Sequence, residues 1–276
     1  MAALIAVASS LMWGTADFLG GVTSRRLPAL AVYGLSQAVG FMVLITAATV
    51  TGSWAADPGF WPWAIASSVL GLVGMLSFYT ALAIGPMGIV SPLVSLSVLV
   101  PLSFALLRGE APTGVQVLGI ISAVVGILLA SGPELSGAES ARPLVYAGVA
   151  AACFGGMYLT MAEGSRYSPL MTMTGMRITT VVMFAVILVA VRNIGGAQRA
   201  DALPLVATGV LDAGANLAYG VATTMGLLST TAVLGSLYPV VTALLAAVFL
   251  HERLRAVQYV GVVATIAGVL MISSGA

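Results

Sequence analysis

The stretch Gly132-Pro-Glu-Leu-Ser-Gly-Ala-Glu-Ser-Ala-Arg142 divides this chain almost at its midpoint. It is polar, built of small residues and typical of a linker, whereas the residues on both sides of it are mostly apolar. Of the 276 residues, 60% are hydrophobic and 7% are charged, against roughly 45–50% and 25% in soluble domains. No water-soluble fold could bury that much apolar surface. The composition therefore predicts an all-α integral membrane protein whose solvent is the lipid bilayer.

Ten apolar runs, separated by short breaks rich in Gly, Pro or Arg, flank the linker. Each run is close to the roughly 20 residues that a membrane-spanning helix needs. Before the linker the runs are 2–21, 28–50, 60–84, 88–108 and 112–131, and after it they are 143–162, 169–191, 203–226, 229–251 and 256–273. We therefore expect ten transmembrane helices in two domains, 1–132 and 143–276, joined by a linker at 133–142.

The two halves repeat each other at a nearly constant, ungapped offset. Gly14 falls on Gly155, and the turn Ser24-Arg25-x-x-Pro28 falls on Ser165-Arg166-x-x-Pro169. Near the ends of the halves, where the offset is one position longer, Glu110, Gln116, Gly119 and Gly126 fall on Glu252, Gln258, Gly261 and Gly268. Because Arg, Glu, Gln and Pro are scarce in this chain, shared apolar composition does not explain these matches. They indicate an internal duplication.

Each half contains an odd number of predicted crossings, so the second half enters the membrane from the opposite face. The sequence therefore predicts a five-plus-five inverted repeat about an axis in the membrane plane, arranged around a central cavity. Two halves with the same packing but opposite orientation can exchange conformations, which opens the cavity to one side at a time. This architecture predicts transport by alternating access, in a multi-pass protein of the plasma or inner membrane.

Other classes of function lack the residues they need. All ten basic residues are arginine and nine acids nearly balance them, so there is no basic field to bind a nucleic acid. The chain has one His, one Cys, no His-Glu-x-x-His and no Walker loop. We expect no enzyme, no cofactor and no metal site. An intramembrane serine hydrolase is the remaining enzyme alternative, but no base for it is visible.

Two segments resemble the signatures of a known domain. Gly235-Ser-Leu-Tyr-Pro239-Val-Val-Thr-Ala-Leu-Leu-Ala-Ala-Val-Phe-Leu-His-Glu252-Arg-Leu, followed by Gly261 and Gly268, resembles the closing signature of an EamA domain, and Trp13-Gly14 resembles its opening. Ser95-Leu-Ser-Val, leading to Arg108-Gly-Glu110, is a looser copy in the first half. The chain thus resembles the drug/metabolite transporter (DMT) superfamily, in its ten-helix branch with two EamA domains. Members export amino acids, metabolites or drugs, so the resemblance implies a secondary transporter whose cavity is lined by helices one to four and six to nine.

One polar stripe dominates the candidate binding residues. Asp212, Asn216, Tyr219 and Thr223 recur at spacings of four, three and four, which places them on one face of a helix. Asp212 would bind a cationic group or exchange a proton, or it would only hold the bundle together through Arg177. Arg177 would hold a substrate carboxylate through its planar fork, or serve as the counter-ion of Asp212.

Aromatic residues and a second acid complete the candidate site. Asp17 follows Trp13 by one helical turn, as Gln37 follows Tyr33. Their alternative role is packing in the core of the bundle. The predicted substrate-binding residues are Trp13, Asp17, Tyr33, Gln37, Tyr79, Tyr158, Arg177, Asp212, Asn216, Tyr219 and Tyr238. We expect an exporter of a small amphipathic metabolite, an amino acid or a related compound, with a multidrug or organic-cation exporter as the alternative.

The remaining conspicuous residues are expected to have structural roles. The repeat-related Glu110 and Glu252 end two predicted helices and would bind backbone amides or arginines. Gly119, Ser122, Gly126, Ala264 and Gly268 form small-xxx-small stripes. These stripes serve either internal packing or a homodimer, so the sequence leaves open whether the chain acts as a monomer or a homodimer.

Overall fold

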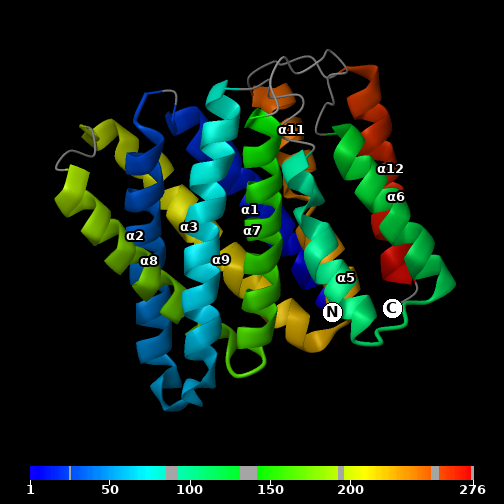
Figure 1. Ribbon diagram of the computed structural model, residues 1–276, viewed down its shortest axis with the longest axis horizontal. Helices are drawn as coiled ribbons and strands as arrows, with labels where there is room; N and C mark the ends of the chain where they lie inside the picture. The colour runs from blue at the N-terminus through cyan, green and yellow to red at the C-terminus, as the bar shows by residue number, and fades with distance from the viewer. Residues whose placement is uncertain (25, 85–92, 131–141, 192–195, 250–254, 275–276) are drawn as a thin grey trace.

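The computed structural model describes residues 1–24, 26–84, 93–130, 142–191, 196–249 and 255–274, and in this part of the chain every regular element is helical (Figure 1). The first half contains α1 (Ala2–Ser24), α2 (Ala29–Val50), η1 (Ser53–Ala55), η2 (Pro58–Phe60), α3 (Trp61–Ile84), η3 (Leu96–Val98), α5 (Leu99–Leu107) and α6 (Gly114–Ala130). The second half contains α7 (Arg142–Ser165), α8 (Pro169–Val191), η4 (Arg199–Asp201), α9 (Ala202–Met225), α10 (Leu228–Gly235), α11 (Tyr238–Phe249) and α12 (Ala256–Ser274).

These helices have the lengths and composition of membrane spans. Seven are long and apolar enough to cross a bilayer, the last of them formed by α10 and α11 together. Three shorter apolar helices, Leu93–Leu107, Gly114–Ala130 and Ala256–Ile272, accompany them in the described residues. This confirms the predicted all-α membrane fold of ten helices. The predicted linker at 133–142 falls almost entirely outside the described residues.

Two predicted helices are interrupted at equivalent places. The run expected as one helix over 229–251 is divided, because α10 ends at Gly235 and α11 begins at Tyr238. Pro239 follows directly and has no N–H to continue the hydrogen bonds of the preceding turn. In the first half the 3₁₀ turn Leu96–Val98 precedes α5, whose first turn contains Pro101. The offset that takes Gly14 to Gly155 also takes Leu96 to Leu237, so both halves carry the same break.

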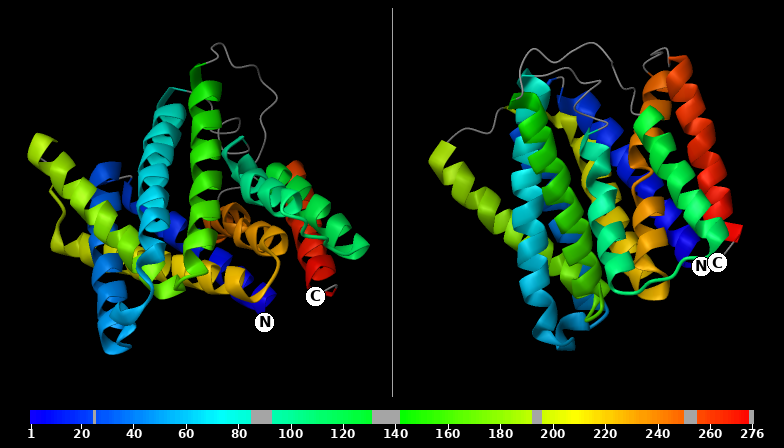
Figure 2. Two further views of the ribbon diagram at one scale, coloured as in Figure 1. Left: turned by 60° about the horizontal axis from the view of Figure 1, so that its bottom comes forward. Right: turned by 45° about the vertical axis from the view of Figure 1, so that its right-hand side comes forward.

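The packing of α6 against α12 shows that the repeat is inverted. A Cβ atom added at Gly119 would come within 2.9 Å of the Gly268 carbonyl oxygen, and one added at Gly126 within 2.8 Å of that of Gly261. Residue numbers rise along one helix as they fall along the other, so these two equivalent helices are antiparallel. Equivalent helices are antiparallel only if the two-fold axis lies in the membrane plane. The small-residue stripes therefore pack the two halves of one chain together, and Figure 2 shows the pair at one end of the bundle.

The first helix of each half makes a matching contact with the other half. Helix α1 packs along α9, and the equivalent α7 packs along α3. A Cβ atom at Gly14 would come within 2.7 Å of the Tyr238 carbonyl oxygen, and one at Gly155 within 2.5 Å of that of Ser97. The same repeat offset relates both members of these two contacts. The repeated glycines thus let each first helix lie directly against the interrupted helix of the opposite half.

Gly126→Ala should destabilise the protein by roughly 1–3 kcal/mol, because the new methyl group overlaps the backbone of α12. The matched control is Gly148→Ala in α7, where a Cβ atom would meet nothing within 4 Å. That variant should be neutral or slightly more stable, since alanine favours a helix over glycine. Thermal unfolding in detergent, followed by circular dichroism, measures both. Equal stability of the two variants would contradict the close packing of α6 and α12.

Candidate substrate-binding site

A hydrogen-bonded polar cluster joins α2, α8 and α9 at membrane depth. The Arg177 guanidinium lies 2.5 Å from an Asp212 carboxylate oxygen and donates a hydrogen bond to the side-chain oxygen of Gln37. The Gln37 amide donates to the same Asp212 oxygen over 3.2 Å. The Asn216 amide donates to the other Asp212 oxygen, also over 3.2 Å. Four of the predicted site residues are thus brought together.

The burial of this ion pair indicates that Asp212 is the structural counter-ion of Arg177. The Arg177 side chain is 3% exposed and that of Asp212 is 23% exposed. An arginine buried in a membrane needs a partner, because its charge cannot be solvated by lipid. Asp212 is that partner in this conformation, and its own side chain remains partly exposed. The geometry therefore supports the counter-ion alternative for Arg177.

Four aromatic rings from both halves form a second cluster beside the polar one. The Trp13 ring of α1 lies 5.5 Å from Tyr158 of α7, 5.6 Å from Tyr219 of α9 and 6.3 Å from Tyr238 of α11. Tyr158 and Tyr219 are themselves 5.6 Å apart. These separations are those of favourable aromatic pairs. All four residues were predicted from the sequence, and the structure places them in contact around Trp13.

A related aromatic pair lies at the symmetric position. The rings of Phe78 and Phe154 are 6.3 Å apart, and the repeat offset relates them to Tyr219 and Trp13. Phe154 was not expected from the sequence, although the offset applied to Trp13 would have found it. The same offset relates Asp17 to Tyr158, so equivalent positions carry a carboxylate in one half and a phenol in the other.

Asp17 is exposed on a helix face that does not point to lipid. Leu4 and Leu11 mark the lipid-facing side of α1, and at 3.6 residues per turn Asp17 lies about 120–140° away from them. Asp17 follows buried Trp13 by one turn of α1, so both lie on the same side of that helix. Among the described residues, Asp17 presents a carboxyl group that has no hydrogen-bond or ion-pair partner.

Tyr219 contributes a polar atom without a partner. Its side chain is buried between Trp13 and Tyr158, and among the described residues its hydroxyl oxygen has no hydrogen-bond partner. A buried, unsatisfied hydroxyl costs about 1–3 kcal/mol. A ligand group that reached this hydroxyl would relieve that cost.

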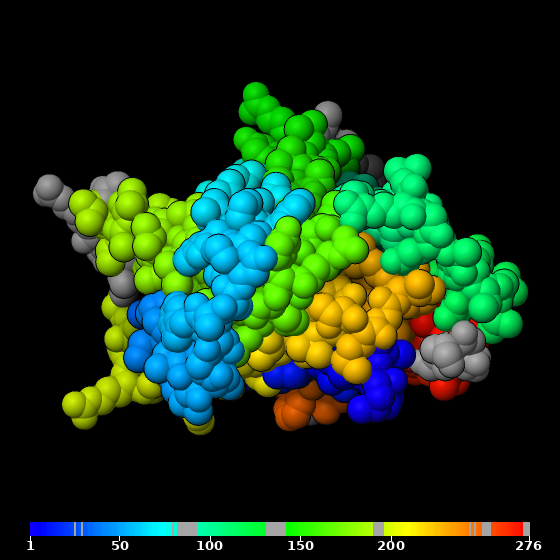
Figure 3. Space-filling model, turned by 90° about the horizontal axis from the view of Figure 1, so that it is seen from below, coloured from blue at the N-terminus to red at the C-terminus, as the bar shows by residue number. Residues whose placement is uncertain are grey.

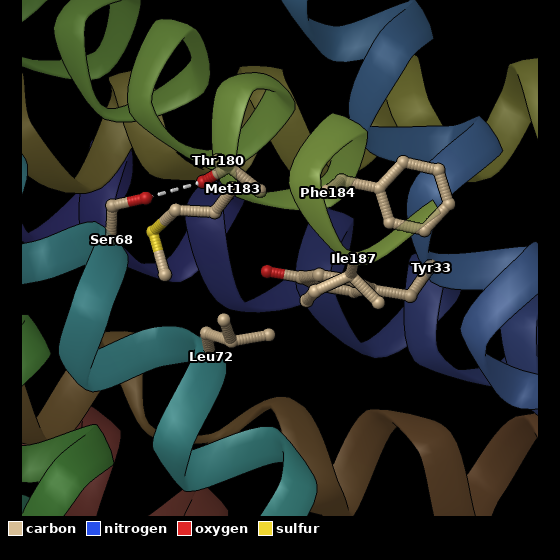
Figure 4. Close-up of a pocket in the computed structure, with 7 residues that line it drawn as sticks. All are labelled: Tyr33, Ser68, Leu72, Thr180, Met183, Phe184 and Ile187. Carbon is tan, nitrogen blue, oxygen red and sulfur yellow. Dashed lines mark hydrogen bonds between the residues drawn. The ribbon is translucent and has the colours of Figure 1, made fainter. Parts of the chain in front are cut away.

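Tyr33, another predicted site residue, does not join these clusters. Tyr33 lines a narrow apolar cleft between α2, α3 and α8, together with Leu72 and Phe184 (Figure 4). The Ser68 and Thr180 hydroxyl oxygens, 2.6 Å apart, bridge the helices there. Tyr33 thus lies at the edge of the site, one turn from Gln37. The side chain of Tyr79 falls outside the described residues.

Charged side chains at helix ends hold together the face on which α1 begins and α12 ends; Figure 1 has this face at the bottom and Figure 3 views the molecule from that side. The Glu110 carboxylate accepts hydrogen bonds from the backbone N–H groups of Leu228 and Ser229 over 2.8 and 3.0 Å, which caps the start of α10. Glu163 pairs with Arg108 at the end of α5 and with Arg166 at the end of α7. The expectation that Glu110 binds backbone amides is confirmed, whereas Glu252 lies outside the described residues.

The comparisons with known proteins agree with this architecture. The EamA-like transporter family matches residues 1–132 and 142–274. The chain belongs to this family. It is therefore an integral membrane protein of the DMT superfamily with two EamA domains, and it transports small molecules. A solved structure titled only "Crystal structure of protein" has the same fold, with a TM-score of 0.82 at 19% identity over 99% of this chain and 96% of that one. A comparison with curated proteins finds no match.

We expect Arg177→Met alone to destabilise the transporter by about 3–5 kcal/mol, because it leaves Asp212 as an unpaired charge among the helices. The double variant Arg177→Met/Asp212→Leu should recover most of that loss, since it removes both charges. Thermal unfolding of the wild type, both single variants and the double variant completes a double-mutant cycle. If the double variant is no more stable than Arg177→Met, Asp212 is not the partner that compensates Arg177.

Proposed function

We propose that this transporter exports a small amphipathic metabolite bearing a protonated amine, an amino acid or a related compound, by alternating access. The observation that carries the proposal is Asp17, which has no hydrogen-bond or ion-pair partner among the described residues and follows by one helical turn Trp13, whose ring packs on that of Tyr238. A carboxylate next to aromatic faces binds an ammonium group through ion pairing and cation–π attraction. The same rings would cover the apolar part of an amphipathic substrate.

Alternating access is supported by the inverted repeat, whose two halves are joined at both ends; at the end opposite the termini, Arg26 pairs with Asp201 over 3.2 Å. Around the termini, Glu110 caps α10 and Glu163 binds Arg108, which ties helices of both halves together. Asp17 lies nearer the opposite end of α1 and is exposed. Because the two halves have equivalent packing, exchanging their conformations would open one face of the bundle and close the other.

The expected role of Arg177 differs between the two candidate substrates, an amino acid and an organic cation. An amino acid also carries a carboxylate, and in this scheme the spare N–H groups of Arg177 would receive it. An organic cation has no carboxylate and would need only Asp17 and the rings. The pairing of Arg177 with Asp212 favours this second candidate. Proteoliposomes supplied with labelled amino acids and with organic cations, each with and without a pH gradient, separate the two and detect proton coupling.

Asp17→Asn should lower transport by at least about tenfold in these proteoliposomes, because it removes the charge that attracts the ammonium group. Asp17→Glu should retain part of the activity. Asp57→Asn is the control, since Asp57 sits in the connection before α3, where it caps η2. Wild-type transport rates in Asp17→Asn would refute the assignment. If Arg177→Met/Asp212→Leu still transports amino acids at the wild-type rate, Arg177 does not bind their carboxylate.

Tyr219→Phe should raise the melting temperature of the substrate-free protein, because it removes a buried hydroxyl without a partner. It should also raise the substrate KM, since the bound substrate loses that hydrogen bond. Tyr146→Phe provides the control, because Tyr146 is an exposed residue of α7. A lower melting temperature in Tyr219→Phe would show that the hydroxyl already has a structural partner.

A further inference from the structure

An apolar groove on the outer surface of the bundle lies between α5 and α7. It is shallow and open, with a volume of about 430 Å³, and no residue of the aromatic or polar clusters lines it. Its lining residues are Leu99, Val100, Ser103, Phe104, Leu107 and Leu159. From Leu99 to Leu107 the groove follows about 12 Å of helix. That is close to the depth of one bilayer leaflet, whose hydrocarbon layer is roughly 15 Å thick.

Two arginines stand at the end of this groove, on the face that carries the termini. Arg108 follows directly after α5, and its guanidinium carbon lies 4.3 Å from the centre of the Phe104 ring. Arg166 follows α7. Both bind Glu163, over 2.9 and 3.1 Å, yet their side chains are 51% and 64% exposed while that of Glu163 is 11% exposed. One acid therefore balances only one of the two arginines.

The guanidinium groups retain donors for a further anion. Each uses one terminal nitrogen for Glu163, whereas an arginine has five N–H donors arranged in a fork. Such a fork matches two oxygens of a phosphate group. Because Arg108 stacks on Phe104, its charge is held at the point where an acyl chain in the groove would meet its headgroup. Two guanidinium groups with free donors at headgroup level favour the phosphate of an anionic lipid over a zwitterionic headgroup.

We propose that this groove is a binding site for one anionic phospholipid, with an acyl chain along α5 and α7 and the phosphate on Arg108 and Arg166. The site does not depend on which substrate is transported. Because Arg108 and Glu163 also tie α5 to α7, a lipid bound there bridges two helices from opposite halves of the repeat. The bound lipid would therefore stabilise the conformation in which this face is closed.

The test uses the full chain reconstituted in nanodiscs of equal phosphatidylglycerol and phosphatidylcholine. Native mass spectrometry of the released protein then counts the lipids that it retains. The wild type should retain one phosphatidylglycerol in preference to phosphatidylcholine. Arg108→Gln/Glu163→Gln/Arg166→Gln, which leaves no unpaired charge, should retain it about tenfold less, as expected for the loss of charge-assisted hydrogen bonds. Arg199→Gln, an exposed arginine in η4, should behave as the wild type.

A second pair of variants tests the groove separately from the charges. Ser103→Phe fills the groove without altering either arginine and should also lose the retained phosphatidylglycerol. Leu106→Phe adds a ring to the same helix at an exposed position outside the lining and should not. Circular dichroism confirms that each variant is folded. Equal retention of the two lipids by the wild type, or undiminished phosphatidylglycerol retention in Ser103→Phe, would overturn the proposal.

Discussion

A buried positive charge at membrane depth constrains the centre of this transporter. Lipid cannot solvate the Arg177 guanidinium, so α8 must pack where α9 supplies Asp212 and α2 supplies Gln37. Asn216 then completes the carboxylate's hydrogen bonds from the next turn of α9. Any conformational change in the bundle has to move these helices together or replace each partner that is lost. The polar cluster therefore holds α2, α8 and α9 together next to the aromatic cluster.

The two halves share a fold but differ in chemistry, and this difference creates the candidate site. Gly14 and Gly155 make the same close contact in each half, as do the interrupted helices around Ser97 and Tyr238. The polar and charged groups at the centre of the bundle do not follow this symmetry. Where the first half has Asp17, the second has a tyrosine, and the ion pair lies wholly within α8 and α9. Backbone packing preserves the repeat because close helix contacts tolerate only small residues, whereas cavity-facing positions are free to diverge.

Much of the fold was predictable because its signals are local or periodic. Apolar runs of spanning length predicted the ten helices, and the odd number per half predicted the inversion that α6 and α12 display. The spacing of Asp212 and Asn216 placed them correctly on one face of α9. Other features depend on contacts between distant segments. Tyr33 has the same helical spacing from Gln37 as Trp13 has from Asp17, yet only packing decides that it lines a peripheral cleft.

The sequence by itself therefore determined the membrane class, the ten helices, the duplication and the residues able to carry charge or aromatic surface. Hydropathy and repeat spacing are properties of the chain alone, since they follow from the bilayer thickness and the helical period. Only the tertiary structure decided that Arg177 pairs with Asp212, that three tyrosine rings converge on Trp13, and that Asp17 has no ion-pair or hydrogen-bond partner among the described residues. The physical reason is that pairing energies depend on distances of a few ångströms between helices far apart in sequence, and no local pattern records those distances.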